Sequence, residues 1–339
     1  MSSPIKHSRS PLLWPLIGLA FLILLNVAMD LRAGEWKFLK ITILDGHLYG
    51  LPVDILNQGS RGMILALGMT LIIATGGVDL AVGSLMAMAG SVAAVLIAQQ
   101  GVSWPLAVTA ALAVTVLGGA VSGELVARLG VQPIVATLIV MVVGRGVAQL
   151  VTSGEVVLIK HAAFEFLGNG FVFGVPFSVV LVAVLYLAAN WLLRKTATGL
   201  FIEAVGDNET ASRFAGLAAA RLKALVYVFG GFCAGVAGLL ATSNIRAADP
   251  YRAGENMELD AIFAVVVGGT ALTGGRFWLM GSLIGALLLQ TLTTTLYNLG
   301  VAPAVATVPK AFLIIAVCLM QSDKTRSWLR GLFVRRKTS

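Results

Sequence analysis

Long apolar runs dominate this chain, and they constrain its fold more than any other feature. A bilayer core takes about 20 consecutive apolar residues per helix, and runs of this kind recur along most of the sequence. Only 12% of the residues are charged, which is half of the roughly 25% found in soluble domains. Such a chain cannot cover a water-facing surface with charge. We therefore expect an all-α integral membrane protein.

The apolar runs predict about ten membrane spans, with eight spans and two re-entrant segments as the alternative. They lie at 12–29, 54–75, 80–100, 105–127, 133–152, 176–193, 224–243, 259–275, 279–299 and 303–321. No polar stretch between them is long enough to form a soluble domain. We therefore predict a single transmembrane domain over residues 1–339.

The distribution of lysine and arginine predicts the orientation. An even number of spans places both termini on one side, together with the loop 194–223. That loop and the tail 322–339 carry many of the basic residues, and basic segments stay in the cytoplasm. We predict that the tail 1–11, the loop and the tail 322–339 are cytoplasmic. The net charge of +8 then reflects topology and does not indicate nucleic-acid binding.

Two junctions between predicted spans are rich in glycine, at 75–79 and 273–276. Each is compatible with a short hairpin or with a helix broken within the membrane, as transporters have near their substrate route. The glycine density of 74–90 is similar to that of 267–285. An internal repeat and chance similarity explain this equally well.

The first junction carries an acidic residue between apolar segments. An aspartate at the centre of a membrane helix costs about 2.5–3.5 kcal/mol, so Asp79 must face water, a polar partner or the interface. One hypothesis is that it shapes the translocation path. The other is that it caps the next helix by accepting N–H bonds from Val82 or Gly83. The candidates for the path in this segment are Gly76, Gly77, Asp79 and Ser84.

A second candidate lies inside the fifth predicted span, where Arg145 stands between two glycines and precedes Gln149. An arginine at this depth must reach the interface or pair with another group. It either faces the pore or forms a structural ion pair, with Asp79 and Glu124 as the possible acidic partners.

The loop between the sixth and seventh spans carries a third candidate, at 201–216. Asp207 or Asn208 can cap a short helix there, and Gly216 can end it. A compact helix on the basic side suggests a docking element, and an ordinary solvated connector is the alternative. The residues that we assign to such docking are Glu203, Ala204, Gly206, Asn208, Arg213 and Gly216.

Polar residues follow one another along the ninth predicted span. Hydroxyl and amide groups suit an uncharged sugar, and they also serve as hydrogen-bond partners between helices. The stripe consists of Gln290, Thr291, Thr293, Thr294, Thr295 and Asn298. From it we take Gln290, Thr294 and Asn298 as candidates for the substrate path.

The sequence lacks the motifs for ATP binding, for catalysis and for metal binding. The sequence contains no G-x-x-x-x-G-K-[ST] and no catalytic signature, so we expect neither ATP binding nor catalysis in this chain. Cys233 and Cys318 lie in apolar runs and form no Cys/His cluster. This arrangement predicts neither a metal nor another cofactor.

Residues 68–84 resemble the signature of the ribose-type branch of ABC sugar permeases, GG-[IV]-DLSVG, with Ala81 in place of the usual serine. The segments 203–216, 258–269 and 274–276 match as well, and the similarity covers nearly the whole chain. A closer resemblance, in 44–50, 52–57 and 143–149, is to galactofuranose importer permeases of enterobacteria.

The resemblance implies the permease of an ABC importer in the bacterial inner membrane, carrying a galactofuranose-like, galactose-like or ribose-like monosaccharide. It implies a cytoplasmic ATPase that docks on the 203–216 coupling segment, a periplasmic sugar-binding protein and a second permease subunit, identical or similar. An ion-coupled secondary sugar transporter is the main alternative, since such proteins place ionisable residues within the membrane. A passive channel and a non-transporting scaffold or enzyme are the others.

Overall fold

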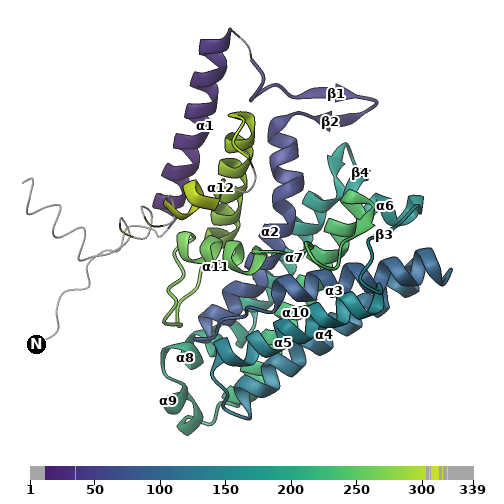
Figure 1. Ribbon diagram of the computed structural model, residues 1–339. Helices are drawn as coiled ribbons and strands as arrows, with labels where there is room; N and C mark the ends of the chain where they lie inside the picture. Colours follow the sequence, from purple (N-terminus) through teal and green to yellow (C-terminus); the bar gives the residue numbers. More distant parts are fainter. Residues whose placement is uncertain are drawn as a thin grey trace, which may run out of the picture.

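The computed structural model describes residues 12–34 and 36–302, together with 305, 307–312, 315 and 319. Long helices make up most of it (Figure 1). They are α1 Leu13–Ala33, α2 Leu51–Ala74, α3 Val82–Ala94, α4 Trp104–Ala127, α5 Pro133–Val151, α7 Phe177–Lys195, α10 Ala219–Ile245 and α12 Leu279–Asn298. The shorter helices are the π-helical turn η1 Val95–Gln99, α6 Ala162–Asn169, α8 Thr198–Asp207, α9 Glu209–Phe214 and α11 Met257–Val267.

Small antiparallel ribbons occupy the connections between helices. Each has two strands: β1 Thr42–Leu44 with β2 His47–Tyr49, β3 Val157–Leu158 with β6 Ala247–Ala248, and β4 Phe171–Val172 with β5 Val175–Pro176. The prediction of helical spans therefore holds for the apolar runs, whereas the connections contain short strands that it did not include.

Seven helices in the described part of the chain are long and apolar enough to cross a membrane. They are α1, α3 with η1, α4, α5, α7, α10 and α12. Helix α2 has the length, at 24 residues, but its first half carries Asp54, Gln58 and Arg61, and it is not among the seven. About ten spans are thus not confirmed. The predicted tenth span falls mostly outside the described residues, and the tails 1–11 and 322–339 fall wholly outside them.

The predicted eighth span, 259–275, is wrong. The helix in this range, α11, has 11 residues in all and ends at Val267. A helix of this length extends about 16 Å, or half of the bilayer core. Backbone angles that suit glycine end it, with φ of 95° at Gly269 and 88° at Gly274. The chain then turns into α12, and α11 and α12 pack against each other as a hairpin.

Helix α10 is the centre of the bundle and packs against α2, α3 and α4. Small residues permit this close packing. A Cβ added to Gly119 of α4 would lie 3.1 Å from the Cα of Gly231 in α10, so only glycine lets the two backbones approach each other in this way. Helices α2 and α3 both contact α10 but scarcely touch each other, so the first glycine-rich junction is not a tight hairpin.

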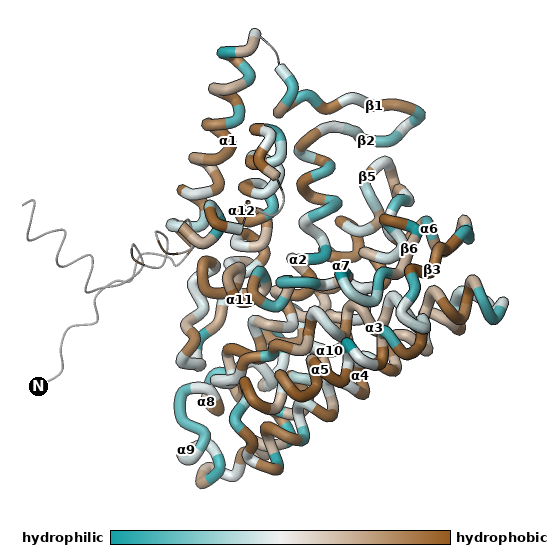
Figure 2. Tube along the Cα trace, viewed as in Figure 1, coloured by the Kyte–Doolittle hydropathy of each residue, from teal (hydrophilic) through white to brown (hydrophobic). Residues whose placement is uncertain are grey.

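The two ends of the bundle differ. Helices α8 and α9 lie together at one end, and the β1–β2 and β4–β5 hairpins lie at the other (Figure 1). Hydrophobic residues dominate the helices between them, while hydrophilic residues gather in α9 (Figure 2). At the hairpin end the N–H of Leu48 donates to the carbonyl of Gly174 over 2.9 Å, and the rings of His47 and Phe171 stack with centroids 4.5 Å apart. The two hairpins therefore form one platform.

Candidate functional site

Both glycine-rich junctions meet at one place, directly beside α8. The N–H of Gly275 donates to the carbonyl of Ala74 over 2.9 Å. A Cβ added to Gly206 of α8 would lie 2.5 Å from the nitrogen of Gly275, and one added to Gly274 would lie 3.0 Å from the nitrogen of Gly76. Side chains at these positions would force the three segments apart. The sequence predicted each segment separately, but not that they touch.

Asp79 is completely buried at the end of this junction. Its Oδ1 accepts the N–H of Ala81 over 2.8 Å, and Ala81 itself is the residue that precedes α3, with no side-chain cap. The predicted capping bonds from Val82 or Gly83 are therefore wrong. The other oxygen, Oδ2, has no hydrogen-bond partner among the described residues. Asp79 thus shapes the turn into α3, and it lines neither of the two polar cavities beside residues 249–258.

The residues around Asp79 are also tightly packed. The Tyr227 hydroxyl of α10 donates to the carbonyl of Val78 over 3.2 Å, and a Cβ on Gly77 would lie 2.5 Å from that hydroxyl oxygen. Ser84 is also buried, and its hydroxyl donates to the carbonyl of Ala81 over 2.9 Å. A Cβ on Gly144 of α5 would lie 2.8 Å from the Ser84 Oγ, so the start of α3 and α5 fit closely together.

Arg145 binds backbone carbonyls, and it has no ion pair with any residue in the described part of the chain. Its Nη1 donates to the carbonyls of Pro250, Tyr251 and Ala253 over 3.2, 3.2 and 2.8 Å. Neither acidic partner that the sequence suggested is correct. Asp79 has the contacts given above, and Glu124 pairs with Arg128 over 3.0 Å.

Two polar cavities lie on either side of residues 249–258. The first, of about 340 Å³, lies between α2, α10, α11 and α12. Its uncharged polar lining residues are Gln58, Thr242, Gln290 and Thr293, and its charged ones are Arg61, Asp249, Arg252, Glu255 and Asp260. The second, of about 550 Å³, lies beside α5, and its polar lining residues are Ser84, Arg145, Gln149, Tyr251, Glu255, Asn256 and Glu258. Both volumes are in the range of small-molecule sites.

The polar stripe on α12 divides between two roles. The hydroxyls of Thr291, Thr293 and Thr295 donate to carbonyls four residues back in the same helix, and Asn26 of α1 donates to the Thr295 hydroxyl over 2.7 Å. These groups mainly satisfy the helix and its packing. Gln290 lines the first cavity, and Thr293 borders it as well.

The other two candidates of the stripe lie apart from that cavity. Thr294 is half-buried, and its hydroxyl is 3.4 Å from the Gln290 amide nitrogen. Asn298 is exposed and borders a separate hollow near α1, lined by Asp30 and Lys37 among others. The structure thus brings Gln290 and Thr294 together and separates Asn298 from them.

The predicted docking segment forms the compact helical element that we expected. Asn208 caps α9, accepting the N–H of Ala211 over 2.9 Å, and Gly216 follows α9 with φ of 84°. Glu209 forms ion pairs with Arg213 and with Lys223 at the start of α10. Burial by itself would raise the pKa of the Glu209 carboxyl, but the hydrogen bonds and charges of Lys223 and Arg213 lower the pKa below its ordinary value.

This element presents a mixed surface. Phe214 is 89% exposed at the end of α9, and Leu200 is 68% exposed on α8. Glu203 and Ala204 are half-buried, and Arg213 is exposed. A large aromatic side chain that remains exposed beside charged groups is typical of a protein interface.

Sequence reasoning offered none of the five charged residues of the first cavity as a candidate, and Arg61 and Asp260 show why. Arg61 stands inside α2, where a basic residue in a predicted span is the same signal that identified Arg145. Asp260 of α11 pairs with Lys310 over 3.0 Å. That pair joins residues 50 positions apart, and periodicity alone cannot find it.

Comparisons with known proteins find import permeases among the relatives of this chain. The chain is 43% identical to the galactofuranose transporter permease protein YtfT of Escherichia coli over 99% of this chain and 97% of that protein. It is 38% identical to the fructose import permease protein FruF of Bifidobacterium longum, over 94% and 90%. It is 41% identical to the ribose import permease protein RbsC of Escherichia coli, over 80% and 85%.

No solved structure matches the chain. The family described as "Branched-chain amino acid transport system / permease component" matches residues 51–318. Transport permeases of this kind are not enzymes, and the apolar helices fit a multi-pass inner-membrane protein. The chain belongs to this permease family.

Proposed function

We propose that this chain is the transmembrane permease of an ABC importer that carries a monosaccharide across the inner membrane. The observation that carries the proposal is the packing of an exposed docking element, α8–α9, against the junctions that lead to the cavity-lining helices α2 and α11. Relatives named for the import of galactofuranose, fructose and ribose support a sugar as the substrate. ATP is hydrolysed by a separate subunit, since this sequence has no phosphate-binding loop.

The docking element faces the cytoplasm in this proposal, as do both termini. The basic residues of the loop 194–223 and of the tail 322–339 support this orientation. The ATPase contacts Phe214, Leu200 and the charged groups around Glu203 and Arg213. Because Gly206 touches both glycine-rich junctions, a displacement of α8 moves the ends of α2 and α11.

The first cavity is the part of the sugar path that this chain supplies. A sugar offers many hydroxyl groups and no charge, so amide and hydroxyl side chains bind it without a counter-ion. Gln58, Gln290 and Thr293 provide such groups from α2 and α12. Arg61 and Asp260 supply stronger, charge-assisted hydrogen bonds.

The opposite end receives the periplasmic sugar-binding protein. Its platform of two hairpins carries Phe173, which is fully exposed at the tip of the β4–β5 turn, and Ile43, which is 70% exposed on β1. Exposed aromatic and aliphatic groups on a rigid turn are suited to docking a partner. A second permease subunit, identical or similar, completes the pore.

The test is uptake of labelled monosaccharides into proteoliposomes that contain the chain with its ATPase and binding protein. Galactofuranose, galactopyranose, fructose and ribose are compared with and without ATP. Gln290→Ala is expected to raise the KM for the transported sugar about fivefold, the effect of losing one hydrogen bond. Thr109→Ala, which removes an exposed hydroxyl bonded only within α4, is expected to leave KM unchanged.

Charge reversal at both Glu203 and Arg213 is expected to abolish ATP-dependent uptake without affecting binding of the sugar-binding protein. Uptake that follows an ion gradient and ignores ATP would contradict the proposal and favour the ion-coupled alternative.

A further inference from the structure

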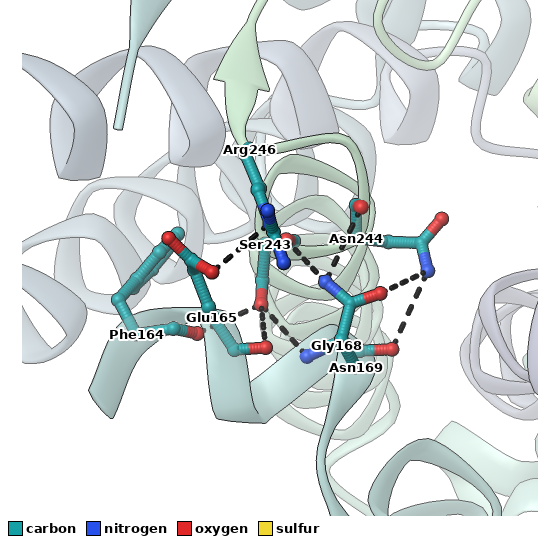
Figure 3. A network of polar contacts seen from close by, with 7 residues as sticks. All are labelled: Phe164, Glu165, Gly168, Asn169, Ser243, Asn244 and Arg246. Carbon is teal, nitrogen blue, oxygen red and sulfur yellow. Dashed lines mark hydrogen bonds and ion pairs between the residues drawn. The ribbon is translucent and has the colours of Figure 1, made fainter. Parts of the chain in front are cut away.

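Residues 249–256 form a loop whose first end is firmly fixed. The preceding strand β6 pairs with β3, Ala248 opposite Val157. A network of polar contacts joins α6 to the end of α10 (Figure 3). In it the Ser243 hydroxyl accepts the N–H of Gly168 over 2.7 Å, and Arg246 pairs with Glu165 over 2.9 Å.

Beyond this fixed end the loop has no regular structure of its own. The Asp249 carboxylate accepts the N–H groups of Tyr251 and Arg252 over 2.9 and 3.0 Å, which bends the first turn. Gly254 and Asn256 both have left-handed backbone angles, with φ of 70° and 61°. Such a path holds its position only where surrounding groups determine it.

Arg145 is the main group that does so. Three carbonyls of the loop point at one nitrogen of its guanidinium, so the loop is wrapped around the end of this side chain. Arg145 comes from α5, whose surrounding side chains at 138, 139, 142, 143 and 150 are apolar and exposed. In such surroundings a carbonyl without a donor is costly, and an arginine offers five N–H groups.

A second contact holds the loop from the other side. A Cβ added to Gly254 would lie 2.8 Å from the carbonyl carbon of Gly83 in α3, and a Cβ on Gly83 would overlap the carbonyl oxygen of Gly254. The loop is therefore pressed against the start of α3 as well as tied to α5. Gly83 belongs to the sequence signature that follows Asp79.

The loop fixed in this way separates the two polar cavities. Asp249, Arg252 and Ala253 line the first cavity, whereas Tyr251 and Asn256 line the second. Glu255 lines both. The wall between two hollows of about 340 and 550 Å³ is thus one loop thick at this point.

We propose that Arg145 is a positioning residue for transport: it holds residues 249–256 as the wall between the two cavities, and so maintains the first cavity in its sugar-binding shape. The inference rests on the proposed sugar path. Arg145 acts on the sugar through the loop. Without it the loop leaves α5 and the two cavities join.

The position of the loop is tested without any transport. Ala253→Cys is introduced after Cys233→Ala and Cys318→Ala, and its reaction with a membrane-impermeant maleimide is timed in proteoliposomes. Ala253 is half-buried, so labelling is expected to be slow when Arg145 is present. Arg145→Gln is expected to accelerate it about tenfold, because hydrogen bonds from a charged donor are lost, and Arg145→Lys about threefold, because an ammonium group retains some of them.

Two controls accompany this measurement. Arg128→Gln removes a positive charge just after the end of α4, whose partner is Glu124, and it is expected to leave labelling at position 253 unchanged. Phe173→Cys reports the exposed turn between β4 and β5, and its labelling is expected to be the same with and without Arg145. Unchanged labelling at position 253 in both Arg145 variants would overturn the proposal. If Arg145→Gln does not accumulate in the membrane, unchanged labelling in Arg145→Lys alone would overturn it.

The consequence for transport is a change in KM. Arg145→Gln is expected to raise the KM for the sugar about tenfold with a smaller change in maximal rate, and Arg145→Lys is expected to recover part of the loss. A fall in maximal rate that parallels the amount of folded protein, with KM unchanged, would mean a purely structural arginine. Absence of ATP-dependent uptake in the unmodified protein would instead refute the proposed function and leave the labelling result standing.

Discussion

Gly206→Ala is the substitution that most directly tests whether α8 transmits motion to the membrane helices. The added methyl group would lie 2.5 Å from the nitrogen of Gly275 and 3.0 Å from the carbonyl carbon of Ala74. These are backbone atoms of two other segments, joined to each other by a hydrogen bond of 2.9 Å. No side chain can rotate away to make room, so the backbones must separate.

The magnitude follows from two contributions. Inserting a methyl group into a well-packed site costs about 1–3 kcal/mol, and loss of the bond between Gly275 and Ala74 adds about 0.5–1.5 kcal/mol. Together they weaken the docked arrangement of α8 by about 1.5–4.5 kcal/mol, which is a change of roughly tenfold or more in its equilibrium. We expect ATP-dependent uptake to fall at least about tenfold, by the same relation.

The assay measures uptake and ATP hydrolysis on the same proteoliposomes. Hydrolysis is expected to continue but to lose its stimulation by loaded binding protein, because the substitution leaves the proposed ATPase-docking surface on α9 intact. Gly146→Ala adds the same methyl group where nothing lies within 4 Å, and it serves as the control for thermal stability, with an unchanged Tm. Normal uptake and Tm in Gly206→Ala would refute the argument that these glycines transmit motion.

Three further predictions concern groups around the same path. Phe214→Ser is expected to abolish capture of the ATPase in a pull-down while Tm stays constant. The side chain is 89% exposed, and substitutions at such surface positions alter stability by about 0.5 kcal/mol or less. Retained capture would exclude Phe214 from the interface. The pKa of Glu209 lies below its ordinary value of 4.5, so its ion pairs stabilise α9 fully above that value and less as the pH falls below it. Hydrogen exchange in α9 should therefore rise on acidification in the unmodified protein and rise less in Glu209→Gln. Equal pH profiles of exchange in the two proteins would contradict this. Asp79→Asn keeps the oxygen that accepts the Ala81 N–H and should retain Tm. Asp79→Leu leaves the buried N–H of Ala81 without an acceptor and should lower the free energy of unfolding by about 1–3 kcal/mol. Equal Tm values for the two variants would show that the bond is dispensable.

The membrane helices were largely predictable because hydropathy and length determine them. The predicted span 133–152 is found as Pro133–Val151, and 176–193 as Phe177–Lys195. The eighth span failed because an apolar run of sufficient length was interrupted by glycines at 269 and 274. Their left-handed angles end the helix, and hydropathy is insensitive to that. Apolar composition alone does not distinguish a full span from a half-helix.

The partners of polar groups were much less predictable. The sequence singled out Arg145 correctly as an unusual residue, but its acceptors lie 105 to 108 positions away and are backbone carbonyls. Every residue has a carbonyl, so no side-chain pattern marks these acceptors. The same holds for Gly206, whose neighbours are backbone atoms of Ala74 and Gly275. Residue types identify sites where chemistry is unusual, and only the fold identifies what they contact.

In the proposed transport cycle, the short length of helix α11 lets it carry movement from α8 to the first cavity. One end of α11 supplies Met257 and Asp260 to the first cavity, and the other leads into the junction that Gly206 touches. A rigid helix of 11 residues extends about 16 Å, so a shift of its glycine-rich end displaces the cavity wall without rearranging the bundle. A full span of about 30 Å would be held at both membrane surfaces. The short helix is held by its packing and by the pair of Asp260 with Lys310, which makes it the element best placed to carry a movement of α8 to the sugar.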